Sequence, residues 1–255
     1  MPITDTLRQQ VARLAREAGD AILDLYERPL DVDYKHDSSP LTDADRQAHA
    51  IICAGLHALT PDWPVLSEES TPEVMRQRLG WRRFWLVDPL DGTKEFISRN
   101  GEFTVNIALI EEGRPVWGVV YAPVLGVSWS GGPTLGAERA EAGETHPVKV
   151  QPHRDGEVWK VVGSRHHLSP ETQAYLDKLT GPVELVSMGS SLKLCLVAEG
   201  KAHLYPRLAP TCEWDTAAAQ AVVEGAGGRV TTLEGEPLHY GKAEILNPWF
   251  VVSAS

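Results

Sequence analysis

The 255-residue sequence is poor in cysteine and in basic residues. Its three cysteines, Cys53, Cys195 and Cys212, are an odd number at wide spacing and form no paired Cys/His pattern. This excludes a disulfide framework and a Cys/His zinc site, and it fits a reducing compartment. The chain carries 24 lysines and arginines against 35 aspartates and glutamates, a formal charge of −11. That balance argues against non-specific binding to nucleic acid or to an anionic membrane.

The sequence also lacks a long hydrophobic run. Residues 1–10 are polar and contain no apolar core of a signal peptide. No stretch approaches the roughly 20 apolar residues that a membrane-spanning helix needs. We therefore expect a cytoplasmic protein without a transmembrane segment. A peripheral association with the inner membrane and a homodimer are both left open.

The sequence does contain an alternation of helical and strand-like segments, which predicts an α/β protein. A second helix is predicted to begin after Thr42, a natural N-cap. Residues 151–156 are polar and rich in turn residues, so we place a boundary there between two lobes, 1–152 and 153–255. The first helix is indicated by apolar residues at three- and four-residue steps: Leu7, Val11, Leu14, Ala18, Ile22 and Leu25.

The most informative stretch is residues 84–96. Residues 84–87 form an apolar run of strand length, and Asp88 follows directly, so we expect its side chain to be rigidly held but open to solvent. A proline comes next, and Asp91-Gly92 is a turn signal. Two carboxylates three residues apart across such a turn can converge on one cation. A hairpin with a solvated Asp-Gly turn is the alternative.

Several acidic residues are expected at the ends of elements, and together they suggest a metal site. Oxygen ligands without Cys or His favour Mg²⁺ or Mn²⁺ over zinc. Carboxylates packed together repel each other, and their pKa values rise unless cations bind. The backbone amides of Gly92 and Thr93, if they open a helix, would face an anion such as phosphate. The acids concerned are Asp45, Glu68, Asp88, Asp91 and Asp215.

This pattern suggests metal-assisted phosphoryl hydrolysis. Spacing alone does not bring Asp215 to the other acids. Helix capping is the alternative role for Asp45, and an acid on the surface is the alternative for Glu68.

Four motifs occur in an order that resembles the inositol monophosphatase superfamily of lithium-sensitive, Mg²⁺-dependent phosphatases. They are TDAD at 42–45, SEES at 67–70, DPLDGT at 88–93 and WDTAA at 214–218. The resemblance covers nearly the whole chain and implies a layered αβαβα sandwich with two mostly antiparallel or mixed sheets. The first lobe would hold the metal and phosphate site, and the second would contribute Asp215 and nucleotide contacts.

Within the superfamily, three further segments resemble the bacterial CysQ-type branch of 3′(2′),5′-bisphosphate nucleotidases. They are KEF at 94–96, RNGEFTVN at 99–106 and GSSLK at 189–193. Ala219 departs from many relatives, which have glycine there, and a helix should tolerate alanine at that position. The branch implies removal of the 3′-phosphate from adenosine 3′,5′-bisphosphate to give AMP. The alternatives are an inositol or sugar phosphatase and, less favoured, a non-catalytic nucleotide or metal sensor.

The resemblance also implies the metal ligands. Glu68, Asp88 and the Leu90 carbonyl would hold a first ion. Asp88, Asp91 and Asp215 would hold a second. Two or three Mg²⁺ ions are implied, and Mn²⁺ would be an acceptable substitute.

The remaining roles concern water and substrate. Asp45 and Thr93, supported by Thr42, would orient and deprotonate the attacking water. Arg99 and Arg165 join Lys94 and Lys193 as candidate partners of the second phosphate, with a solvated surface role as the alternative for each. The full set of implied substrate contacts is Glu68, Leu90, Asp91, Gly92, Thr93, Lys94, Ser190, Lys193 and Asp215.

Overall fold

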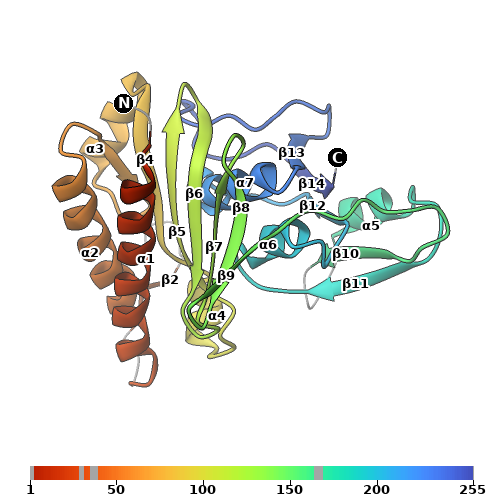
Figure 1. Cartoon of the computed structure of the whole chain (residues 1–255), viewed down its shortest axis with the longest axis horizontal. Helices are drawn as coiled ribbons and strands as arrows, with labels where there is room; N and C mark the ends of the chain where they lie inside the picture. The colour runs from red at the N-terminus through yellow and green to blue at the C-terminus, as the bar shows by residue number, and fades with distance from the viewer. Residues whose placement is uncertain (1–2, 29–31, 35–39, 164–168, 255) are drawn as a thin grey trace.

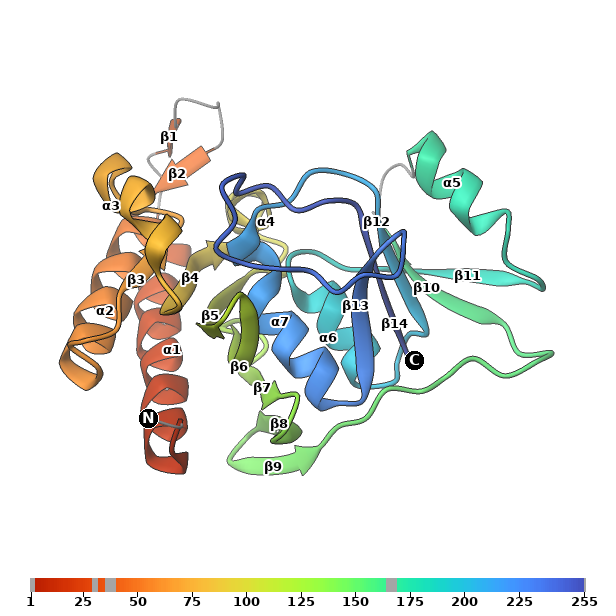
Figure 2. The same cartoon turned by 90° about the horizontal axis from the view of Figure 1, so that it is seen from above.

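The chain folds into five layers in the order helix, sheet, helix, sheet, helix (Figures 1 and 2). The structure is a computed structural model, and it describes residues 3–28, 32–34, 40–163 and 169–254. The αβαβα sandwich expected from the sequence is therefore confirmed. Its helical layers are, in order, α1 (Asp5–Tyr26) with α2 (Asp43–Leu59), then α6 (Leu192–Ala198) with α7 (Glu213–Gly225), then α5 (Pro170–Leu176).

The larger sheet has seven strands in the order β3-β4-β5-β6-β7-β8-β9. Strand β3 runs parallel to β4, and all other neighbours in this sheet are antiparallel. The strands are β3 (Val65–Ser67), β4 (Arg83–Asp91), β5 (Thr104–Glu111), β6 (Arg114–Ala122), β7 (Val127–Gly132), β8 (Gly136–Glu141) and β9 (Glu144–Pro147). Shorter elements of this half are β1 (Val32–Tyr34), β2 (Pro40–Thr42), α3 (Pro72–Gln77), the 3₁₀ helix η1 (Arg78–Gly80) and α4 (Thr93–Ile97).

The smaller sheet has five strands in the order β11-β10-β12-β14-β13. It is mixed, because β10 runs parallel to β11 and β12 whereas β14 runs antiparallel to β12 and β13. Its strands are β10 (Trp159–Gly163), β11 (Val183–Ser187), β12 (Leu204–Arg207), β13 (Gly228–Thr232) and β14 (Phe250–Ala254). Helices α6 and α7 thus lie between two sheets, so α7 is buried on most of its surface.

Helix α1 shows how the sequence builds the outer layer. The Thr4 hydroxyl accepts a hydrogen bond from the Leu7 amide at 3.2 Å, as expected for an N-cap. The apolar stripe predicted from the sequence is buried from Val11 to Ile22 and packs in one cluster with Trp85 of β4. Helix α2 begins after Thr42 as predicted. The outer helices therefore cover the face of the large sheet that lies opposite α7 (Figure 1).

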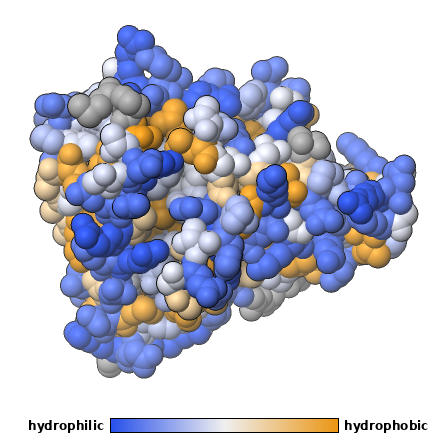
Figure 3. Space-filling view, in the orientation of Figure 1, coloured by the Kyte–Doolittle hydropathy of each residue, from blue (hydrophilic) through white to orange (hydrophobic). Residues whose placement is uncertain are grey.

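One face of the molecule shows the distribution of polar and apolar residues on the surface. On the face shown in Figure 3, hydrophilic side chains predominate and hydrophobic ones are scattered between them. Across the described residues, no helix combines the length and the apolar character needed to cross a bilayer. Cys53, Cys195 and Cys212 are free thiols, as the sequence predicted.

Candidate active site

The site is built on the end of β4, where the strand bulges. Strand β4 pairs with β5 in regular register up to Asp88 and resumes only at Asp91. The intervening irregularity turns the strand, as bulges beside active sites do. The Asp88 side chain is 1% exposed, so the expectation that it is open to solvent was wrong. The physical reason is that β4 does not stop at Asp88 but continues to Asp91 inside the sheet.

Four acidic residues, Glu68, Asp88, Asp91 and Asp215, lie close enough for their charges to interact. Burial raises the pKa of Asp88 well above its ordinary value, and the negative charges of Glu68, Asp91 and Asp215 raise it further. The hydrogen bond from the Leu90 amide opposes the shift. Glu68 is held beside the strand because its own amide donates to the Val87 carbonyl at 3.0 Å. The structure thus brings Asp215 to the other acids, which spacing in the sequence could not show.

The two partly exposed aspartates are also shifted. Burial raises the pKa of Asp91 to about 6, against the opposing effects of the Lys193 charge and the Ser191 amide. Burial, followed by the charge of Asp91, raises the pKa of Asp215 to about 8, against the Cys212 amide. Shifts of this kind are common at functional sites in pockets.

A backbone amide fixes one oxygen of each of these three aspartates. Within the described residues, the hydrogen bonds leave the second oxygen of each carboxylate for another ligand. Asp91 is held across 100 residues of sequence, which ties the large sheet to the start of α6. The donors, acceptors and N···O distances are Leu90 to Asp88 (3.1 Å), Ser191 to Asp91 (2.6 Å) and Cys212 to Asp215 (2.8 Å).

The acids fit a divalent cation by their chemistry. Among the described residues, no three Asp, Glu, His or Cys side chains already enclose a common point closely enough to hold an ion. Burial and, after it, the neighbouring negative charges raise the pKa values of Asp88 and Asp215, and a bound cation would offset both effects. The donors are all oxygen, which suits Mg²⁺.

A chain of hydrogen bonds joins Thr42, Asp45 and Thr93. The Thr42 amide and hydroxyl both donate to Oδ2 of Asp45, at 2.8 and 2.6 Å. The Thr93 hydroxyl donates to Oδ1 of the same carboxylate at 3.3 Å. One oxygen of Asp45 thus serves the capping box of α2, and the other faces Thr93. The capping alternative and a role beside Thr93 are compatible.

Gly92 shapes the turn between β4 and α4. Its φ of 95° lies in the left-handed region, and a Cβ there would lie 3.3 Å from the Glu102 carbonyl and from Ser190 Cβ. Only glycine meets both conditions without strain. Ser190 itself has a φ of 45°, so both segments that flank this side of the site have unusual backbone conformations.

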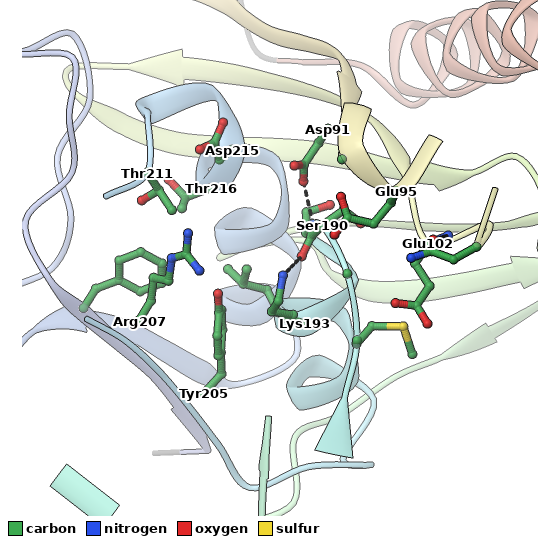
Figure 4. Close-up of a pocket in the computed structure, with 17 residues that line it drawn as sticks. Asp91, Glu95, Glu102, Ser190, Lys193, Tyr205, Arg207, Thr211, Asp215 and Thr216 are labelled. Atoms are coloured by element: carbon green, nitrogen blue, oxygen red, sulfur yellow. Dashed lines mark hydrogen bonds between the residues drawn. The ribbon is translucent and has the colours of Figure 1, made fainter. Parts of the chain in front are cut away.

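A pocket of about 310 Å³ opens beside these acids. Figure 4 shows Asp91 and Asp215 on one side of it, with Lys193, Tyr205 and Arg207 on the other. The Lys193 ammonium donates to the Ser190 carbonyl at 3.1 Å. Both Ser190 and Lys193, which the sequence predicted as substrate contacts, therefore line the same cavity as Asp91 and Asp215.

Two other residues predicted to contact the second phosphate, Lys94 and Arg99, do not line this pocket. Lys94 is exposed on α4 and does not line this pocket. The Arg99 guanidinium donates to the carbonyls of Tyr26 and Arg28 and lies 5.5 Å from the Tyr26 ring centroid, so it joins α4 to the end of α1. Arg165 lies outside the described residues.

Some residues that line the pocket were not identified from the sequence. Tyr205 and Arg207 lie on β12 and line the pocket, and neither belongs to a motif that the sequence analysis identified. Glu95 and Glu102 add negative charge to the rim. The only available signal was the position of Arg207 at a strand end, which is too common to be diagnostic.

The sequence of the chain matches that of known proteins. The model of the "Inositol monophosphatase family" matches residues 4–249. The chain is 53% identical over 247 residues to "3′(2′),5′-bisphosphate nucleotidase CysQ" of Escherichia coli K12, covering 96% of this chain and 98% of that protein. A protein of the same name from Haemophilus influenzae is 32% identical over 99% of this chain and 94% of its own length.

Solved structures of other proteins have a similar fold. CysQ from Bacteroides thetaiotaomicron, described as a bacterial member of the inositol monophosphatase family, superposes with a TM-score of 0.84 at 45% identity, with 97% of each chain covered. An inositol monophosphatase from Thermotoga maritima superposes with a TM-score of 0.78 at 24% identity, over 98% of this chain and 92% of that one. The second likeness concerns the fold alone.

Proposed function

The chain belongs to the inositol monophosphatase family, and from this premise we propose that it is a 3′(2′),5′-bisphosphate nucleotidase that hydrolyses the 3′-phosphate of adenosine 3′,5′-bisphosphate to AMP and phosphate. The relatives with the highest identity reported above carry the nucleotidase name, over nearly their whole length. The single observation in the structure that supports the reaction is the gathering of Glu68, Asp91 and Asp215 around buried Asp88, whose pKa their negative charges raise, beside a pocket.

We propose that Mg²⁺ binds these acids. Glu68, Asp88 and the Leu90 carbonyl would hold one ion, and Asp88, Asp91 and Asp215 another. Bound Mg²⁺ supplies a Lewis acid that lowers the pKa of water and stabilises charge on the leaving oxygen. Asp88, as the acid coupled to all the others, is the candidate bridge. The number of ions, two or three, and the use of Mn²⁺ stay predictions.

Asp45 and Thr93 are proposed to prepare the nucleophile. The Thr93 hydroxyl donates to Asp45, so its oxygen lone pairs can accept a proton from a water lying on the other side. The proton taken up by Thr93 is matched by the one passed to Asp45. Thr42 holds Asp45 in place by two hydrogen bonds. The amides of Gly92 and Thr93 are proposed to bind the phosphate, which is attacked in line by water without a phospho-enzyme.

Lys193 and Ser190 are the proposed contacts to the remainder of the substrate. Both line the pocket next to Asp91, and burial lowers the pKa of Lys193 while the charge of Asp91 raises it. A phosphorylated nucleotide is therefore the proposed small-molecule partner. The division into lobes at residues 152 and 153, the cytoplasmic location, peripheral membrane association and homodimer formation stay predictions.

Phosphate release from a substrate panel tests the function. With Mg²⁺ present, we expect turnover of adenosine 3′,5′-bisphosphate, loss of turnover on chelation with EDTA, and inhibition by lithium. A preference of more than about tenfold in kcat/KM for inositol monophosphate, about 1.4 kcal/mol in transition-state binding, would assign the chain to the inositol phosphatases instead. No Mg²⁺-dependent release from any member of the panel would indicate a sensor.

A further inference from the structure

The turn that carries Glu68 follows β3 directly. Strand β3 pairs in parallel with β4, and Ser67 lies opposite Val87. The next residues along the two strands are close enough for the charge of Glu68 to raise the pKa of Asp88. The Ser67 amide donates to the Ser70 hydroxyl at 2.9 Å, and the Ser70 amide donates to the Ser67 carbonyl at 2.9 Å. This reciprocal pair closes the turn, so the position of Glu68 depends on how Ser67 is held.

A buried hydroxyl joins this turn to helix α2. Ser67 is fully buried, and its Oγ accepts a hydrogen bond from the Glu69 amide at 3.3 Å. The same Oγ shares a hydrogen bond of 2.9 Å with Nδ1 of His49, which is partly buried on α2 and lies 18 residues earlier in the chain. A hydroxyl has one proton and two lone pairs, so it can make both bonds at once. Together they fix the start of the turn against α2.

The histidine shares a face of α2 with a residue of the site. Asp45, which is proposed to prepare the nucleophile, lies one helical turn before His49, so both side chains leave the same face of the helix. Cys53 lies one turn further along, and its Sγ is 3.6 Å from Nδ1 of His49. The ring is therefore held between its own helix and Ser67. One helix thus positions Asp45 directly and contacts the turn of Glu68 through His49.

We propose that His49 is a positioning residue that acts through Ser67 to orient the turn from which Glu68 binds Mg²⁺. The inference rests on the proposed function, since it assigns a support to one of the proposed metal ligands. Residues that hold a metal ligand in place typically change metal affinity or activity about 10- to 100-fold when they are removed. His49 does not line the pocket beside the acids, so its loss should act on the metal rather than on substrate contacts.

Calorimetric titration of the metal-free protein with MgCl₂ tests the proposal and needs no turnover. His49→Ala should weaken Mg²⁺ binding about tenfold, the lower end of the range for such supports. His49→Asn should recover most of the affinity, because the asparagine amide can form a hydrogen bond near the position of Nδ1. His57→Ala is the matched control, since His57 is exposed two turns further along α2 and the chemical change is the same. It should bind Mg²⁺ like the wild type.

A double-mutant cycle tests the route through Ser67. Ser67→Ala should lower Mg²⁺ affinity at least as much as His49→Ala, and His49→Ala added to Ser67→Ala should cause little further loss, because the bond between them is already absent. Additive losses would mean that His49 acts by another route, and the proposal is overturned. Circular dichroism and melting in EDTA show that each variant folds. If His49→Ala lowers only the melting temperature and keeps wild-type Mg²⁺ affinity, its role is merely structural and the proposal is likewise overturned.

The outcomes separate this inference from the proposed function. If Mg²⁺ affinity depends on His49 but the wild-type protein releases no phosphate from adenosine 3′,5′-bisphosphate, the function is overturned and the positioning role is kept. If the wild type hydrolyses the bisphosphate and His49→Ala binds Mg²⁺ equally well, the positioning role alone is overturned. Wild-type protein that binds no Mg²⁺ would overturn both.

Discussion

At Asp88, burial and charge are in conflict. It is 1% exposed, lies in a seven-stranded sheet and is coupled to three other acids. A carboxylate in such a place is retained at a cost in stability, since an amide or an apolar group would be easier to bury. The cost is understandable if the charge is used to bind cations.

Replacing Asp88 by asparagine should therefore separate stability from activity. We expect Asp88→Asn to lose roughly a thousandfold or more of kcat, because several kcal/mol of transition-state stabilisation depend on the bridging charge. In EDTA, its melting temperature should equal or exceed that of the wild type, because the amide carries no charge to desolvate. Steady-state kinetics and calorimetry measure the two effects.

Asp62→Asn is the matched control for that experiment, because Asp62 is exposed in the loop after α2 and the chemical change is the same. It should alter neither quantity appreciably. Near-normal turnover in Asp88→Asn would contradict the metal assignment.

At the scale of elements, local signals were read correctly and long-range contacts were not. The start of α2 after Thr42 and the apolar stripe of α1 both follow from residues within a turn or two of each other. The length of β4 past Asp88 and the Asp91–Ser191 bond depend on contacts with β5 and α6. Periodicity carries no information about such contacts, so the site residues were predicted from the order of the motifs.

Helix α7 meets the large sheet so closely that no side chain fits at one position. A Cβ on Gly118 of β6 would lie 2.5 Å from the Ala218 carbonyl oxygen and 2.7 Å from its Cα. Both atoms belong to the helix backbone, so α7 would have to move as a unit. The same helix carries Asp215 at its start, which links this packing to the site.

We expect Gly118→Ala to destabilise the protein by about 1–3 kcal/mol, the usual cost of overpacking, and to lower kcat/KM because Asp215 moves with α7. Urea unfolding and steady-state kinetics test this. Gly80→Ala is the control, since Gly80 is exposed in η1 and a Cβ there meets nothing within 4 Å. Equal stability of Gly118→Ala and wild type would show that α7 can shift at no cost.

At the scale of the whole molecule, the acids come from two layers that pack against each other. Asp88 and Asp91 come from the large sheet, and Asp215 comes from the helical layer between the sheets. A cation bound among them would hold these layers together. In a chain with a formal charge of −11, it would also reduce the self-repulsion that opposes compactness. Metal binding should accordingly be visible as global stability.

The pH dependence of that stability has a defined sign. The pKa of Asp215 is raised from 3.8 to about 8 and that of Asp91 to about 6, so the metal-free folded state retains protons that the unfolded chain releases. The contribution of these groups is present below about pH 4 and is lost as the pH rises through about 6 and then about 8. In EDTA, the melting temperature should fall across this window. Magnesium competes with the retained protons, so its stabilising effect should grow over the same interval.

Asp215→Asn should flatten both trends, whereas Asp62→Asn, with the same change in net charge, should not. Melting curves at pH 5, 6.5 and 8, with and without Mg²⁺, decide the matter, and a stabilisation by Mg²⁺ that is equal at all three values would exclude Asp215 and Asp91 as the groups that exchange protons for metal.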